Sequence, residues 1–150
     1  MTAQEMWEQY SAESGVDAPY EAWAFCDGGE VGDKLARLVL AGIKTATASA
    51  YIAYQIENEP VPKVGDYSVI LYDNGEAACI IRDTKVSIVP FDEVSERHAY
   101  LEGEGDRSLD YWRQVHEEFF APDYEEAGLP FDRHGLSVLE EFEVVYRAPA

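Results

Sequence analysis

GIKTATASA, residues 42–50, sets a lysine beside a strict alternation of hydroxyl residues and alanines. Successive side chains of a strand point to opposite faces, so Thr45, Thr47 and Ser49 are expected on one face and the alanines on the other. Gly42 can adopt the positive φ that a sharp turn into such a strand requires. Lys44 would then lie at the turn, where a lysine can act as a base for a neighbouring hydroxyl. An ordinary edge strand, in which the lysine discourages aggregation, explains the same pattern.

The chain has 150 residues, of which 47% are hydrophobic, and this is enough for one domain with its own core. We therefore expect a single domain over residues 1–150, with an N-terminal helix within residues 1–25 as an extension. Cys26 and Cys79 lie far apart and show no C-x-x-C spacing, so neither a zinc site nor a disulfide is indicated. Both are expected to be reduced, buried thiols.

Thirty acidic residues against eleven basic ones give the chain a formal net charge of −19. This charge opposes general attraction to nucleic acid or anionic lipid. We therefore expect a small nucleoside-like ligand, with long nucleic acid bound only in a locally basic cleft, and no membrane partner. The N-terminus lacks a signal-peptide pattern and no apolar run approaches the ~20 residues that span a bilayer, so a cytoplasmic location is expected. The oligomeric state is left open.

Apolar periodicity predicts a succession of helices and short strands. The helices are expected over residues 2–13, 33–40, 95–101 and 108–122, with a short aromatic turn at 20–25. The strands are expected over residues 45–50, 67–72, 77–81, 86–89 and 136–146, with a hairpin at Asn74-Gly75. Residues 50–60 fit either a strand extension or a short helix, and residues 122–135 read as irregular. This order indicates an α+β fold with an antiparallel, closed sheet and flanking helices.

Three motifs in this order resemble the ASCH family, whose members have a small PUA-like β-barrel. They are LAGIKTATAS at residues 40–49, VPKVGD at 61–66 and VSERHAYLEGEGDRSLDYWRQVH at 94–116. The resemblance covers residues 35–146. It implies a PUA-like barrel for most of the chain.

One small bacterial branch of this family is similar in its key residues and removes the acetyl group from acetylcytidine. The resemblance implies that Thr47 is the nucleophile and Lys44 its base. Glu102 would orient the lysine or handle the proton of the leaving amine. The chain departs from that branch at Ser49, where the branch has arginine, and in its GEGDRS segment at residues 103–108. Without the resemblance, Glu102 would read as a solvated carboxylate at a helix end.

Further polar and aromatic residues near these motifs are candidates for substrate binding. They are Thr45, Ser49, Tyr51, Glu104, Asp106, Arg107 and Trp112. Each also has a simpler interpretation as a loop, ion-pair or core residue. Histidines 98, 116 and 134 show no metal-ligand spacing, so neither a metal nor a cofactor is expected.

Two function classes therefore follow from the sequence. The first is an amidohydrolase acting on an N-acylated pyrimidine nucleoside, and the second is an RNA-binding or RNA-processing PUA-like module. A catalytically silent ligand sensor is a third alternative. Basic residues gathered around Lys44 would favour RNA binding, whereas the observed dispersal of the eleven basic residues along the chain favours the hydrolase.

Overall fold

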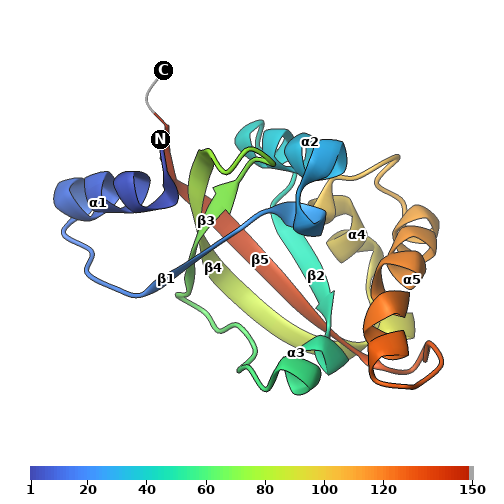
Figure 1. Cartoon of the computed structure of the whole chain (residues 1–150). Coiled ribbons are helices and arrows are strands. Elements are labelled where there is room, and N and C mark those ends of the chain that lie inside the picture. Colours follow the sequence, from blue (N-terminus) through green and yellow to red (C-terminus); the bar gives the residue numbers. More distant parts are fainter. Residues whose placement is uncertain (149–150) are drawn as a thin grey trace. The chain divides into compact units, whose positions relative to one another are not determined.

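The computed structural model describes residues 1–148 (Figure 1). The helices are α1 (Ala3–Ser14), α2 (Gly29–Leu40), α3 (Tyr51–Glu57), α4 (Glu96–Glu102) and α5 (Leu109–Glu126), with short 3₁₀ turns η1 (Phe25–Asp27) and η2 (Phe91–Glu93). The strands are β1 (Tyr20–Trp23), β2 (Ala46–Ala50), β3 (Tyr67–Leu71), β4 (Ala77–Pro90) and β5 (Leu136–Arg147). These strands form a five-stranded sheet in the order β1-β3-β4-β5-β2.

The chain divides into two compact units that interleave along the sequence. The first unit holds residues 1–44 and 64–84 and the chain from Phe142 onward, and the second holds residues 45–63 and 85–141. Strands β4 and β5 contribute residues to both units.

Aromatic packing organises the first unit around α1 and α2. Trp7 of α1 is buried and stacks on Tyr20 of β1, with 4.6 Å between ring centroids. Leu35 and Val39 of α2 share a second buried cluster with Ile70 of β3. Residues 20–23, predicted as part of an aromatic turn, instead form β1, which pairs in parallel with β3. The parallel pairing also departs from the expected all-antiparallel sheet. The loop after α1 brings β1 to the edge of β3 so that the two strands run in the same direction.

The alternation of hydroxyl and alanine residues produces β2 in the second unit. Ala46, Ala48 and Ala50 are buried, whereas Thr47 and Ser49 are half-buried, so the predicted two-faced strand is confirmed. β2 runs antiparallel to β5. Its alanine face packs into a cluster that includes residues of α4 and α5, since small side chains allow close approach.

Two expected element boundaries are wrong, each for a local reason. The strands expected at 77–81 and 86–89 form one strand, β4, because Asp83 continues the backbone pairing by donating its N–H to Asp66 O at 2.9 Å. Helix α5 continues past Pro122 to Glu126, since Phe120 and Tyr124 on either side of the proline are anchored in the core. Residues 51–57 take the helical alternative as α3.

The two cysteines differ in exposure. Cys79 is buried in the first unit, as predicted, but Cys26 is exposed in η1, where the backbone turns sharply with a φ of +51°. Neither cysteine forms a disulfide. Across residues 1–148, no helix has the length and apolar character needed to cross a bilayer.

Candidate functional site

Glu102, the last residue of α4, is a buried carboxylate that is only 1% exposed. Ser95 caps this helix by accepting a hydrogen bond from the His98 N–H at 3.1 Å, and Gly103 ends it with a φ of +73°. His98 and Glu102 are therefore one helical turn apart on the same face. His98 Nε2 lies 2.7 Å from Glu102 Oε2, within the buried interior of the second unit.

Helix α5 completes the surroundings of this carboxylate. Trp112 Nε1–H donates to Glu102 Oε2 at 2.5 Å, and His116 Nε2 lies 3.3 Å from Oε1. His116 Nδ1 donates to the backbone O of Trp112 at 2.8 Å, and the two rings stack with 4.1 Å between centroids. Because Nδ1 is the donor, a neutral His116 presents the lone pair of Nε2 toward Glu102.

Glu104 lies close to the same cluster. Ligand atoms of Glu102, Glu104 and His116 are all within 4.8 Å of one another, so these three residues could together hold a divalent cation. This group shows no metal-ligand spacing in the sequence, because its members come from the end of α4, the following loop and α5.

The loop at residues 103–108 is held by the side chains that were expected to bind substrate. Asp106 accepts a hydrogen bond from the Ser108 N–H at 2.9 Å, and hydrogen bonds from Ser108 lower the pKa of Asp106. Arg107 donates from Nε to the backbone O of Tyr100 at 3.0 Å and stacks on the Tyr100 ring at 3.6 Å. These contacts give Asp106 and Arg107 a role in fixing the loop that carries Glu104.

Lys44 is the last residue of the first chain segment of the first unit, and it is only 1% exposed. Gly42 adopts the predicted left-handed conformation, with a φ of +77°. The Lys44 N–H donates to Leu38 O at 3.1 Å, and its Nζ lies 5.3 Å from the centre of the Phe25 ring. The side chain of Lys44 is therefore buried, although the residue lies at a turn. The meeting of Lys44 with Thr47 and Glu102 stays a prediction.

The three hydroxyl residues of the opening motif have different surroundings. Thr45 donates from its backbone N to Leu101 O at 2.8 Å, and its Oγ1 lies 3.5 Å from the same oxygen. Thr47 lies on the face of β2 opposite the buried alanines, and those alanines pack toward Trp112. Ser49 Oγ is hydrogen-bonded to Tyr54 OH at 2.7 Å. Within the second unit, the backbone of Thr45 is thus held next to the end of α4, whereas Thr47 faces away from that layer.

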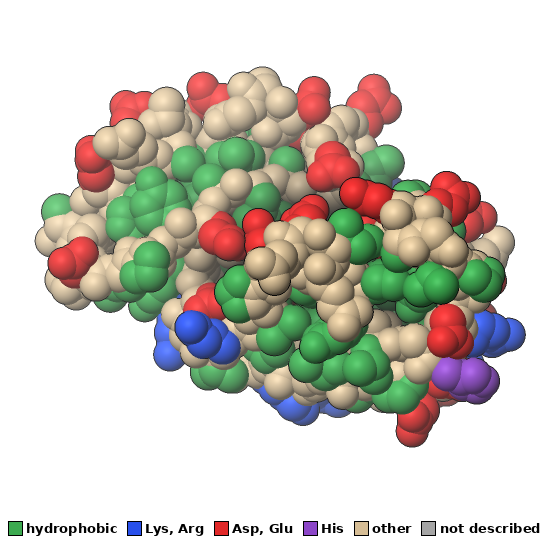
Figure 2. All heavy atoms as spheres, turned by 60° about the horizontal axis from the view of Figure 1, so that its bottom comes forward, with side chains coloured by type: hydrophobic (Ala, Val, Ile, Leu, Met, Phe, Trp, Pro, Cys, Tyr) green, Lys and Arg blue, Asp and Glu red, His purple; other side chains and the backbone are tan. Residues whose placement is uncertain are grey.

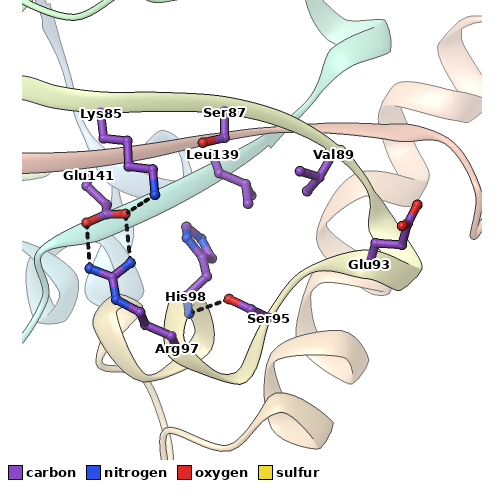
Figure 3. Close-up of a pocket in the computed structure, with 9 residues that line it drawn as sticks. All are labelled: Lys85, Ser87, Val89, Glu93, Ser95, Arg97, His98, Leu139 and Glu141. Atoms are coloured by element: carbon purple, nitrogen blue, oxygen red, sulfur yellow. Dashed lines mark hydrogen bonds and ion pairs between the residues drawn. The ribbon is translucent and has the colours of Figure 1, made fainter.

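Two hollows open on the second unit. The first, here called the α4 hollow, has a volume of about 200 Å³ and lies between α4 and strands β4 and β5 (Figure 3). It is lined by Lys85, Ser87, Val89, Glu93, Ser95, Arg97, His98, Leu139 and Glu141. The second, here called the tyrosine hollow, has a volume of about 400 Å³ and includes Tyr51 and Tyr54. Tyr51 therefore remains a candidate for contacting a ligand, whereas Trp112 is buried under His116 and holds Glu102.

His98 and His116 are the functional candidates that the sequence reasoning missed. Each belongs to a helical pair four residues apart, His98 with Glu102 and Trp112 with His116, and such pairs share a helix face. A search for polar pairs at this spacing would have found both.

The ASCH domain family model matches residues 21–146, and the chain belongs to this family. Its structure resembles that of an ASCH domain from Lactobacillus crispatus JV V101, with a TM-score of 0.88 and 36% identity, covering 96% of this chain and 94% of that chain. A protein from Enterococcus faecalis V583 is 37% identical with a TM-score of 0.89, covering 96% of this chain and 88% of that one. A search of curated proteins found no match.

ASCH domains are PUA-like, so the predicted α+β, PUA-like fold is confirmed. A hypothetical protein that is 17% identical, with a TM-score of 0.54, shares the fold. Members of the ASCH family are proposed to be RNA-binding or hydrolase modules.

Proposed function

We propose that this ASCH domain is a cytoplasmic amidohydrolase that removes the acyl group from an N-acylated pyrimidine nucleoside such as acetylcytidine. The observation that carries the proposal is the burial of one basic and one acidic side chain. Lys44 and Glu102 are each only 1% exposed. Burying a charged group is costly unless it is paired and hydrogen-bonded. Buried ionisable side chains are therefore concentrated at functional sites.

The architecture around Glu102 suits a catalytic carboxylate. Trp112 and His98 hold one carboxylate oxygen, and His116 lies against the other. Fixed donors of this kind keep a reacting group oriented without a cost at the moment of reaction. The cluster thus supports a hydrolase more directly than it supports an RNA-binding surface, which needs exposed cations and aromatic rings.

The position of Lys44 directly before the hydroxyl motif also supports its proposed role. Lys44 is joined by a peptide bond to Thr45, and the Thr45 N–H bonds to the carbonyl of Leu101, the residue before Glu102.

In the proposed reaction, Lys44 takes the proton of the Thr47 hydroxyl while Oγ1 attacks the acyl carbonyl carbon. Collapse of the tetrahedral intermediate breaks the C–N bond, and the leaving amine of the nucleoside takes up a proton. Glu102 orients the lysine or carries that proton. Water then hydrolyses the acyl-threonine ester, which frees the carboxylic acid and restores the hydroxyl.

Isosteric variants test the proposal, because truncating a buried side chain such as Lys44 would also leave a cavity. Lys44→Met, Thr47→Val and Glu102→Gln should each lower the rate of acetylcytidine hydrolysis by about 100-fold to 10,000-fold, since each removes a proton carrier or the nucleophile. Lys44→Arg should also be inactive, because arginine keeps the charge but does not deprotonate near neutral pH. Product formation is measured together with the thermal midpoint of each variant.

Thr45→Val is the comparison that decides the nucleophile, because Thr45 is held at the end of α4 and Thr47 faces the other side of β2. Loss of activity in Thr47→Val with activity retained in Thr45→Val supports the assignment, and the reverse result transfers the role to Thr45. Lys34→Ala and Thr84→Ala change exposed residues and serve as controls. Wild-type rates in well-folded Lys44→Met and Glu102→Gln would refute the proposal.

A further inference from the structure

The tyrosine hollow forms where helix α3 ends and the chain turns back. Asn58 ends the helix in the left-handed conformation, with a φ of +53°, which asparagine adopts more readily than most residues. The Glu59 N–H then donates to a carbonyl of α3 at 3.0 Å. This turn places Glu59, Pro60 and Val61 in the lining beside the helix. One continuous segment, residues 51–61, therefore builds a hollow of about 400 Å³, a size typical of small-molecule pockets.

Two tyrosine side chains form the aromatic part of the lining. The hydroxyl of Tyr54 is hydrogen-bonded to Ser49 Oγ at 2.7 Å, so this ring is held in place by the neighbouring strand β2. Tyr51 is half-buried and makes no ring contact with another aromatic side chain among residues 1–148. Its ring is therefore not already used in an aromatic pair. The faces of such rings are negative and attract cations.

The charged group in the lining is also negative. Glu59 lies in the lining with the amides of Gln55 and Asn58, and within the described part of the chain no lysine, arginine or histidine lines the hollow. Across the same residues, the Glu59 carboxylate forms no ion pair that would cancel its charge. The net charge of −19 adds to the negative potential. The hollow therefore attracts a cation and repels phosphates and carboxylates.

The apolar groups of the lining determine which kind of cation fits. Pro60 and Val61 add apolar surface to the two rings. A metal ion or a primary ammonium group binds water strongly and loses it in such surroundings. A quaternary ammonium group carries its charge under methyl groups, so it can contact ring faces and apolar side chains at once. Gln55 and Asn58 supply amides that can bond a hydroxyl or carbonyl elsewhere on the same ligand.

We propose that the tyrosine hollow binds a quaternary ammonium group, with the rings of Tyr51 and Tyr54 and the carboxylate of Glu59 as its contacts. The hydrogen bond to Ser49 fixes one of these rings before the ligand arrives, which lowers the entropic cost of binding. Binding at this hollow is independent of the proposed hydrolase reaction. A free small molecule and a trimethylated lysine of a protein both carry the required group, and the test separates these two sources.

A titration of the full chain with choline tests the inference. The control ligand is the uncharged carbon analogue of choline, in which a tert-butyl group replaces the trimethylammonium group. The two molecules share their shape and their hydroxyl, so a difference in affinity reports the charge. Choline should shift the ring signals of Tyr51 and Tyr54 in the NMR spectrum. By calorimetry it should bind at least about fivefold more tightly than the analogue, which corresponds to about 1 kcal/mol.

Two pairs of variants assign the contacts. Glu59→Gln should weaken choline binding by at least about threefold, whereas Glu57→Gln should leave it within about twofold of wild type. Glu57 is the matched control, because it is exposed on α3, lies outside the lining and changes the net charge equally. Tyr51→Leu keeps apolar bulk without a π face and should cost at least about fivefold, whereas Tyr51→Phe should stay within about twofold. The thermal midpoint of each variant checks its folding.

Several results would overturn the inference. They are no binding of choline by the wild-type protein, equal affinity for choline and its carbon analogue, equal losses in Glu59→Gln and Glu57→Gln, and unchanged affinity in Tyr51→Leu. Cytidine binding that depends on Tyr51, with no binding of choline, would overturn it in favour of an uncharged ring.

A short peptide that carries trimethyl-lysine identifies the source of the ammonium group. If the peptide binds through Tyr51 and Glu59 at least about tenfold more tightly than choline, the group belongs to a protein partner. If choline binds as tightly or more tightly, the group belongs to a free small molecule. Either order of affinity supports the site, and a peptide or choline that binds independently of both residues contradicts it.

Discussion

Gly105 shows how a single residue can hold the site loop in place. It has a φ of +58°, and a methyl group added there would overlap the ring of Tyr111. The neighbouring Glu104 reaches the cluster of Glu102 and His116. The glycine thus allows the loop to pass beneath an aromatic ring of α5 while it presents a carboxylate to the site.

We expect Gly105→Ala to destabilise the protein by more than its backbone conformation alone would require. Gly128→Ala is the matched control, since Gly128 has a φ of +74° and open space around it. The control should cost about 1–2 kcal/mol from left-handed strain, and Gly105→Ala at least about 1 kcal/mol more from overlap with Tyr111. Urea unfolding measures both. Equal losses would show that the ring moves aside freely.

At the scale of elements, α4 is tied to the sheet by the ion pair of Arg97 with Glu141 on β5. The guanidinium makes two hydrogen bonds to the carboxylate, and these bonds lower the pKa of Glu141 from its ordinary value of 4.5. A carboxyl whose pKa is lowered by folding stabilises the folded state above its ordinary pKa. That contribution is lost as the pH falls through the lowered value.

Glu141→Gln should therefore reduce stability at neutral pH and make little difference in acid. Arg97 is 64% exposed, so solvent screening keeps the loss of stability at pH 7 small. The difference from wild type should shrink toward zero as the pH falls below the lowered pKa of Glu141. Glu143→Gln on the same strand is the control, because its contact with Arg82 is 3.6 Å long and exposed on both sides. A loss that persists unchanged in acid would assign the effect to packing.

For the whole molecule, the dominant property is negative charge. Figure 2 shows acidic side chains scattered over the face in view, with few lysines and arginines among them. The formal net charge of −19 repels a polyanion at long range, and a small uncharged ligand experiences no such repulsion.

We expect a labelled single-stranded RNA to bind weakly and to lose its remaining affinity between about 0.05 M and about 0.2 M salt. Cytidine binding, which needs no phosphate contact, should change little over the same range. Fluorescence anisotropy for the RNA and calorimetry for cytidine give the two curves. Tight, salt-resistant RNA binding would contradict this expectation and support the RNA-binding alternative.

The sequence by itself determined those features that depend on near neighbours. The alternation at residues 45–50 predicted the two faces of β2, Asn74-Gly75 predicted the turn between β3 and β4, and Ser108 predicted the start of α5. Period, turn chemistry and capping act within a few residues, so a single sequence carries them. The order of the three motifs also predicted the ASCH family.

Only the tertiary structure decided which side chains meet. It buried Glu102 at a helix end that reads as solvent-exposed, and it brought His98 and His116 to that carboxylate from two helices. It also buried Lys44 and left Cys26 exposed. Such outcomes depend on how segments distant in sequence pack, and packing can bury a charged group only where other elements supply its hydrogen bonds.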